Sequence, residues 1–144
     1  MKLFFKKTNK AFTLVETLVA VSIFTVSILG LISVLASGIS DTGYAKKKIS
    51  ATYLAQEGIE YTRNIRDTHV LYGGSSGWDD FKSDPNATSY PISDPDFAGF
   101  NRTISMTPVA DTLDEVQITS DVSWSQGSGT YHIIFSENLF NWIE

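Results

Sequence analysis

The feature that most constrains this chain is an apolar run near its N-terminus, from Phe12 to Leu35. A helix of about 24 residues is long enough to cross a hydrocarbon core of about 30 Å. The run is preceded by no acidic residue and by four lysines: Lys2, Lys6, Lys7 and Lys10. Its only charged residue is Glu16. An ionisable group at mid-bilayer costs about 2.5–3.5 kcal/mol, so this carboxylate requires an explanation.

Two simple interpretations leave Glu16 without a role. A secretory signal peptide has a basic start and a small-residue cleavage site, here after Ala36, but its apolar region spans only about 7–15 residues. A single-pass anchor fits the length of the run, and the positive-inside rule places the lysines in the cytoplasm and the C-terminal part outside. We therefore expect a process that uses the charge.

The sequence Ala11-Phe12-Thr13-Leu14-Val15-Glu16 follows a short basic leader and opens an unbroken apolar stretch. It resembles the type III signal of type IV pilins and type II secretion pseudopilins. The resemblance implies that residues 1–11 are a leader, that a prepilin peptidase cuts between Ala11 and Phe12, and that Phe12 is then N-methylated. Ala11 stands where the family more often has Gly, and both residues are small enough for a peptidase pocket.

Cleavage at this position gives Glu16 a physical role. The new amine on Phe12 is positive and lies at the bilayer edge, one helical turn from the carboxylate. In a medium of low dielectric constant an unpaired charge is costly, whereas a paired charge gains from its partner. We predict that Glu16 compensates its own amine or that of a neighbouring subunit, and so sets the register of assembly. The alternative is a snorkelling carboxylate without a role.

The pattern predicts that the helix continues to residue 66 and changes character on the way. Residues 12–35 are apolar all round and predict a transmembrane or filament-core segment, while residues 36–66 predict an amphipathic half. One helical face of that half carries apolar and small residues: Ala51, Leu54, Ala55, Gly58, Ile59, Thr62 and Ile65. Because this face is rich in small residues, we expect a sheet to approach the helix closely.

The C-terminal third, residues 101–144, predicts antiparallel strands at 102–107, 115–125 and 131–136, with a hairpin loop at 126–129. The fold class is therefore α+β, a long N-terminal helix on a small antiparallel sheet of three to four strands, with residues 36–144 as one globular domain. The apolar C-terminal residues either close the core or form an exposed patch: Leu139, Phe140, Trp142 and Ile143.

Residues 67–100 predict a variable loop, because turn-forming residues punctuate them. Whether this loop is a contact surface or only a connection stays open. Its apolar residues either pin it down or form a short strand: Trp78, Phe81, Tyr90, Ile92 and Phe97. Two further segments, 53–66 and 122–142, are similar to V-class minor pilins and I-class pseudopilins.

Charge and composition exclude several function classes. The chain has 11 basic and 16 acidic residues, a net charge of −5, and loss of the four leader lysines makes it −9, so no nucleic-acid partner is indicated. There is no cysteine, and His69 and His132 are the only histidines. No nucleotide-binding, zinc or Ser-hydrolase motif occurs, so we expect no enzyme and no cofactor. A group of aspartates is an option for calcium, with solvated turns as the simpler interpretation: Asp79, Asp80, Asp84, Asp94 and Asp96.

These observations predict a structural subunit, a minor pilin or pseudopilin of a type IV pilus or type II secretion-like filament. Its partners would be other pilin subunits, the prepilin peptidase/methyltransferase and, before assembly, the membrane. It would reside in the inner membrane with the C-terminal domain outside, and later in an extracellular or periplasmic filament. The alternatives are an anchored binding module that never assembles and an anchored hydrolase. Whether the filament serves a pilus, secretion or DNA uptake stays open.

Overall fold

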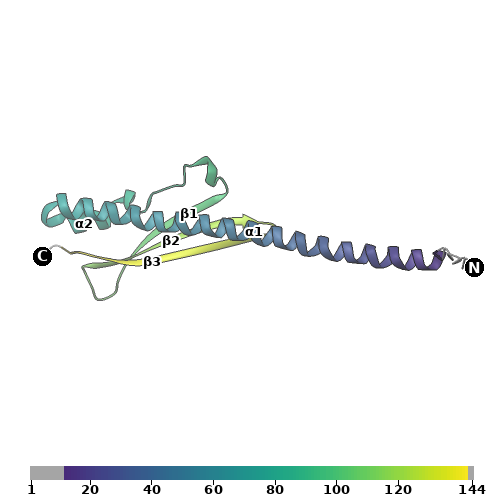
Figure 1. Cartoon of the computed structure of the whole chain (residues 1–144). Helices are drawn as coiled ribbons and strands as arrows, with labels where there is room; N and C mark the ends of the chain where they lie inside the picture. The colour runs from purple at the N-terminus through teal and green to yellow at the C-terminus, as the bar shows by residue number, and fades with distance from the viewer. Residues whose placement is uncertain (1–11, 143–144) are drawn as a thin grey trace, which may run out of the picture. The chain divides into compact units, whose positions relative to one another are not determined.

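The computed structural model of the chain describes residues 12–142 (Figure 1). Its longest element is the helix α1, Leu14–Tyr72. The chain divides into two compact units, Met1–Thr42 and Gly43–Glu144, and α1 contributes its apolar half to the first and its amphipathic half to the second. The predicted leader with its four lysines, Ala11 and the C-terminal Ile143 lie outside the described residues.

The sheet of the second unit has the strands β1 (Phe100–Pro108), β2 (Glu115–Gln126) and β3 (Gly129–Phe140), antiparallel and in the order β1-β2-β3. A two-residue turn joins β2 to β3, since Gln126 pairs with Gly129, and Gly127 has the positive φ of 60° that such a turn requires. The strands lie along the amphipathic half of α1 (Figure 1). The predicted α+β class is confirmed.

The predicted stripe of α1 is buried from Ala51 to Thr62, and Ile65 is half-buried. On the sheet side, β2 presents alternate residues to the helix, all below 4 % exposed: Val116, Ile118, Ser120, Val122 and Trp124. Gly58 marks the closest approach, because a Cβ atom there would lie 2.6 Å from Ser120 Oγ and 3.0 Å from Arg102 Cδ. The small residues of the stripe therefore bring the helix close to the sheet.

Replacing Gly58 by Ala is expected to destabilise the second unit by about 1–2 kcal/mol, because the overpacking cost exceeds the gain in helix propensity. Urea unfolding of the detergent-solubilised chain, followed by tryptophan fluorescence, measures this change, since all three tryptophans lie in the second unit. Gly43→Ala is the matched control, because its Cβ would meet only Gln126 Nε2, at 3.5 Å. A Gly58→Ala protein as stable as the Gly43→Ala control would contradict the close approach.

The segment predicted as a loop, 67–100, is largely helical in the structure. The helix α1 continues to Tyr72 rather than ending at residue 66, and it is followed by the short helices η1 (Gly74–Ser76), α2 (Gly77–Ser83), η2 (Pro85–Thr88) and η3 (Pro95–Phe97). The described residues of this segment form no strand before β1. Each Asp-Pro turn is the start of a helical turn, in which the Asp side chain caps the backbone.

Burial of apolar side chains is the physical reason why this segment is folded into short helices. Val70, Trp78, Phe81 and Ala87 all enter the same core as Ile104 and Ile118, and Phe81 is fully buried. The segment is therefore packed core as well as connection. At the C-terminus both predicted outcomes occur, because Leu139 is buried in this core while Phe140 and Trp142 are about half exposed.

Candidate functional site

The first turn of α1 is organised by Thr13 and Glu16. The Glu16 N–H donates to Thr13 Oγ1 at 3.3 Å, and the Thr17 N–H donates to the Thr13 carbonyl at 3.2 Å. Thr-x-x-Glu is the spacing of a capping box, and a carboxylate in the first turn also interacts favourably with the helix dipole. Glu16 thus occupies a favourable place for starting the helix, a role that the sequence analysis did not consider.

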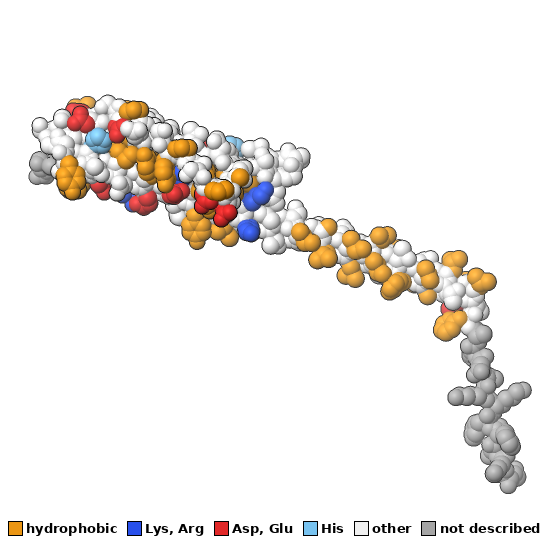
Figure 2. All heavy atoms as spheres, turned by 90° about the horizontal axis from the view of Figure 1, so that it is seen from above, with side chains coloured by type: hydrophobic (Ala, Val, Ile, Leu, Met, Phe, Trp, Pro, Cys, Tyr) orange, Lys and Arg blue, Asp and Glu red, His pale blue; other side chains and the backbone are white. Residues whose placement is uncertain are grey.

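The first unit presents an apolar surface on every side. All large apolar side chains between residues 12 and 39 are at least 38 % exposed, and Figure 2 shows hydrophobic side chains along this stretch of α1. By its length and composition α1 is long and apolar enough to cross a membrane. A continuous apolar surface of this kind requires lipid or protein against it.

Six hydroxyl groups of this stretch are satisfied within the helix itself. They donate to the backbone carbonyl three or four residues earlier at 2.8–3.2 Å, from Thr17, Ser22, Thr25, Ser27, Ser37 and Thr42. An unpaired hydroxyl in an apolar medium costs free energy. These internal bonds therefore make the polar residues of the stretch compatible with lipid and with a neighbouring helix.

Comparison with known protein families matches residues 6–32 to the prokaryotic N-terminal methylation motif. This N-terminus is that of a type IV pilin-like prepilin. The match covers the basic residues from Lys6 on, the Ala11–Phe12 junction, Glu16 and most of the apolar run. A prepilin with this motif is processed by a peptidase, and the motif points to a structural subunit. Its assignment to the V or I class stays a prediction.

No curated protein and no solved structure matches the chain. The second unit, Gly43–Glu144, called here the globular unit, is therefore characterised by its own contacts. Three features of that unit bear on function: a buried arginine, a hollow beside β3, and two histidine–aspartate pairs.

Arg102 is the centre of a polar network that sequence reasoning missed. Its side chain is 1 % exposed. One nitrogen, Nη1, donates to the Leu54 carbonyl and to Glu57 Oε2, both at 2.8 Å, and Nε donates to the Tyr90 carbonyl at 3.0 Å. The guanidinium also lies 4.4 Å from the centre of the Tyr90 ring. Arg102 thus ties β1 to α1 and to the segment before β1.

Tyr90 completes the network. Its hydroxyl donates to Glu57 Oε1 at 3.1 Å, and this hydrogen bond to a carboxylate raises the pKa of Tyr90. The ring stacks on Tyr61 of α1 with centroids 4.1 Å apart and planes 4° apart. One signal in the sequence pointed to the site. Arg102 lies two residues before the inward-facing Ile104, on the same face of the strand, and so places a charge on an apolar face.

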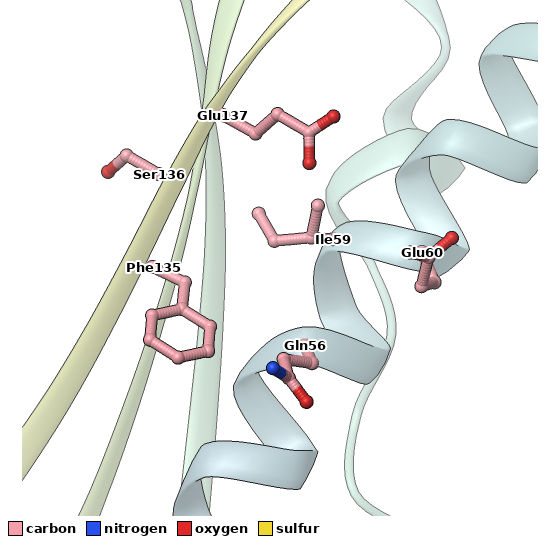
Figure 3. A pocket seen from close by; sticks show the side chains of 6 residues that line it. All are labelled: Gln56, Ile59, Glu60, Phe135, Ser136 and Glu137. Atoms are coloured by element: carbon pink, nitrogen blue, oxygen red, sulfur yellow. The ribbon is translucent and has the colours of Figure 1, made fainter.

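A hollow of about 600 Å³ lies between α1 and β3, lined by Gln56, Ile59, Glu60, Phe135, Ser136 and Glu137 (Figure 3). Arg63 bonds to both Glu60 and Glu137 at 2.6 Å, and the bond to Glu137 raises the pKa of Arg63. In Figure 3 Ser136 points away from the hollow, and its Oγ lies 3.0 Å from Thr119 Oγ1. The hollow thus presents carboxylates already bound to Arg63 and no hydroxyl nucleophile.

Each histidine pairs with one aspartate. His69 Nε2 lies 2.9 Å from Asp84 Oδ2, and His132 Nδ1 lies 3.1 Å from Asp121 Oδ1 on the outer face of the sheet. Residues 12–142 contain no group of three or more His, Asp or Glu side chains placed to hold a metal ion. Three of the aspartates considered for calcium have other contacts, since Asp84 and Asp94 cap η2 and η3 and Asp79 pairs with Lys82.

The Asp84 contacts predict a dependence of stability on pH. The hydrogen bond from His69, followed by that from the Asn86 N–H, lowers the pKa of Asp84 below its ordinary value. Because the unfolded state then binds the proton more readily, this contribution is present at neutral pH and is lost as the pH falls through the carboxyl's pKa in the fold. We expect Asp84→Asn to lose less stability than the wild type between pH 5 and pH 2 (roughly, the range over which a paired carboxylate titrates).

Urea midpoints measured across that range test this expectation. Asp94→Asn is the matched control, because Asp94 caps the same kind of Asp-Pro turn through the Asp96 N–H but has no histidine partner. Equal acid sensitivity in Asp84→Asn and the wild type would show that the His69–Asp84 pair does not contribute.

Proposed function

We propose that this prepilin is a structural subunit of a filament, a minor pilin or pseudopilin of the type IV pilus or type II secretion kind. The single observation that carries the proposal is the first half of α1, an exposed apolar helix with one carboxylate in its first turn. Such a helix is suited first to lipid and then to a bundle of like helices.

The proposed sequence of events starts with insertion of the chain, its leader in the cytoplasm and its globular unit outside. The peptidase hydrolyses the peptide bond between Ala11 and Phe12, and the new Phe12 amine is methylated. An assembly machine then moves the helix from lipid to the filament core, where Glu16 pairs with a Phe12 amine. Direct transfer avoids water, because exposing apolar surface costs about 25 cal/mol per Å². The work is supplied by partner ATPases.

Mass spectrometry of the N-terminus tests the proposal. Filaments sheared from the cells that produce the protein are expected to contain chains that begin at N-methylated Phe12. Chains that retain Met1 and stay in the membrane would instead support an anchored binding module, and chains that begin at Ser37 would support a cleaved signal peptide. Either result would overturn the proposed function.

A further inference from the structure

The charges of the globular unit are unevenly distributed. Four of its basic residues are held in ion pairs with acids of the same chain: Arg63, Arg66, Lys82 and Arg102. The remaining three, Lys46–Lys48, form one basic turn of α1, and none of them takes part in an ion pair within the described part of the chain. Lys47 donates to the Ser125 carbonyl at 2.9 Å, while Lys46 and Lys48 are exposed. The unit therefore has one end with uncompensated positive charge.

The basic turn continues into an apolar ridge on the outer face of α1. Lys46, Ile49 and Tyr53 follow the spacing i, i+3, i+7 and so share one face of the helix. That face lies opposite the residues that pack on the sheet. Ile49 is 57 % exposed and Tyr53 is 66 % exposed. These three residues, called here the basic ridge, combine a cation with two exposed apolar side chains.

The other end of the unit has the complementary composition. A hollow of about 540 Å³ is lined by residues Asp111–Glu115 and by Phe140. Its apolar members are exposed, Leu113 by 83 % and Phe140 by 52 %. Its acidic members are Asp111, Asp114 and Glu115. This surface is called here the acidic hollow.

The nearest cations do not neutralise the acidic hollow. Lys82 Nζ lies 3.3 Å from the Leu113 carbonyl but is paired with Asp79 at 2.8 Å. Arg66 Nη1 donates to the Phe140 carbonyl at 3.2 Å, and its Nε is paired with Asp67 at 2.6 Å. The acidic hollow therefore keeps its negative charge beside exposed apolar groups.

The strand β2 separates the two surfaces. It begins at Glu115, in the acidic hollow, and its Ser125 accepts the bond from Lys47. A strand of 12 residues is about 40 Å long. The two complementary surfaces thus lie toward opposite ends of the second unit. Because a contact between different surfaces of identical subunits repeats without closing unless the rotation forms a ring, such a pair favours an open filament.

We propose that the basic ridge of one copy docks into the acidic hollow of another copy of this chain. The inference rests on the proposed function and specifies which surfaces of the globular unit meet. Opposite charge and exposed apolar groups on both sides argue for a second copy. Anionic lipid headgroups would attract the lysines but would leave the acidic hollow without a role. Lipid binding is therefore an outcome of the test.

Thiol cross-linking gives the first test, because the chain has no cysteine. Filaments of the double variant Lys46→Cys/Asp114→Cys, treated with a short bis-maleimide, are expected to give a ladder of linked subunits. Each single variant is expected to give no ladder. The control Lys46→Cys/Asp96→Cys, in which the second site is an exposed aspartate outside the hollow, is also expected to give none. Intact filaments without a ladder, or links only to a different subunit, would overturn the inference.

Charge reversal gives the second test. Lys46→Glu is expected to reduce filament yield about tenfold, and Asp114→Lys in the same chain is expected to restore it. Asp96→Lys is the control, and urea midpoints confirm that each variant folds. Normal yield from the lysine variant would overturn the inference and leave the proposed function intact, whereas absence of wild-type filaments would overturn the function. A lower membrane pool without rescue would assign the lysines to lipid.

Discussion

Replacing Glu16 by Gln is expected to leave leader cleavage intact and to reduce incorporation into filaments about a hundredfold. The reason is the charge on the new Phe12 amine, which loses its partner in apolar surroundings. An unpaired charge there costs about 2.5–3.5 kcal/mol, and each 1.4 kcal/mol is about tenfold in an equilibrium. Immunoblots of sheared filaments and of membranes, with mass spectrometry of the N-terminus, measure incorporation and cleavage separately.

Thr13→Ala separates this role from helix initiation. The structure gives Glu16 a place in a capping arrangement, and loss of the Thr13 side chain removes the bond to the Glu16 N–H while keeping the carboxylate. A lost N-cap costs about 1 kcal/mol, so Thr13→Ala is expected to assemble far better than Glu16→Gln. Equal losses in the two variants would assign Glu16 to the helix start, and normal assembly of Glu16→Gln would remove the charge from the mechanism altogether.

The parts of the fold that follow from local periodicity were accessible from the sequence. The stripe from Ala51 to Thr62 is buried as its spacing predicts, because a helix must place such residues on one face. The strand β2 matches its prediction to within one residue, since one of its faces is covered by α1. The strand β3 extends beyond the predicted 131–136 to Phe140. Its pairing with β2 continues past Ser136, where Glu137 and Asn138 interrupt the apolar alternation of the sequence. Ile134, 59 % exposed on an edge strand, shows why the pattern is weak there.

The segment 67–100 shows where such reasoning ends. Its glycines and Asp-Pro pairs predict local turns, and the structure has turns at these positions. The helical structure of the segment is determined by the burial of Trp78, Phe81 and Ala87 against strands far along the chain. Arg102 was missed for the same reason, because its partners Leu54, Glu57 and Tyr90 come from two distant segments. Long-range contacts of this kind leave no periodicity, and only the charge on an inward strand position indicated that one existed.

Arg102→Met is expected to destabilise the globular unit by about 3 kcal/mol. Methionine fills much of the same space, so the loss is mainly that of the hydrogen bonds to the Leu54 and Tyr90 carbonyls and of the partner of Glu57. Removing one member of a buried ion pair costs about 3–5 kcal/mol. The lower end applies here because Glu57 is 49 % exposed and regains water. Urea unfolding of the detergent-solubilised chain measures the change.

Two further variants locate the effect in the network rather than in the charge. Arg102→Lys is expected to recover little stability, because a single ammonium cannot reproduce the planar fork that reaches two carbonyls and a carboxylate. Glu60→Gln, which alters an exposed pair of the same helix, is expected to cost less than about 1 kcal/mol. Limited proteolysis should cut Arg102→Met first in the segment before β1, since that segment is bound to α1 through Tyr90. Wild-type stability and unchanged cleavage sites in Arg102→Met would mean that apolar packing alone holds the segment in place.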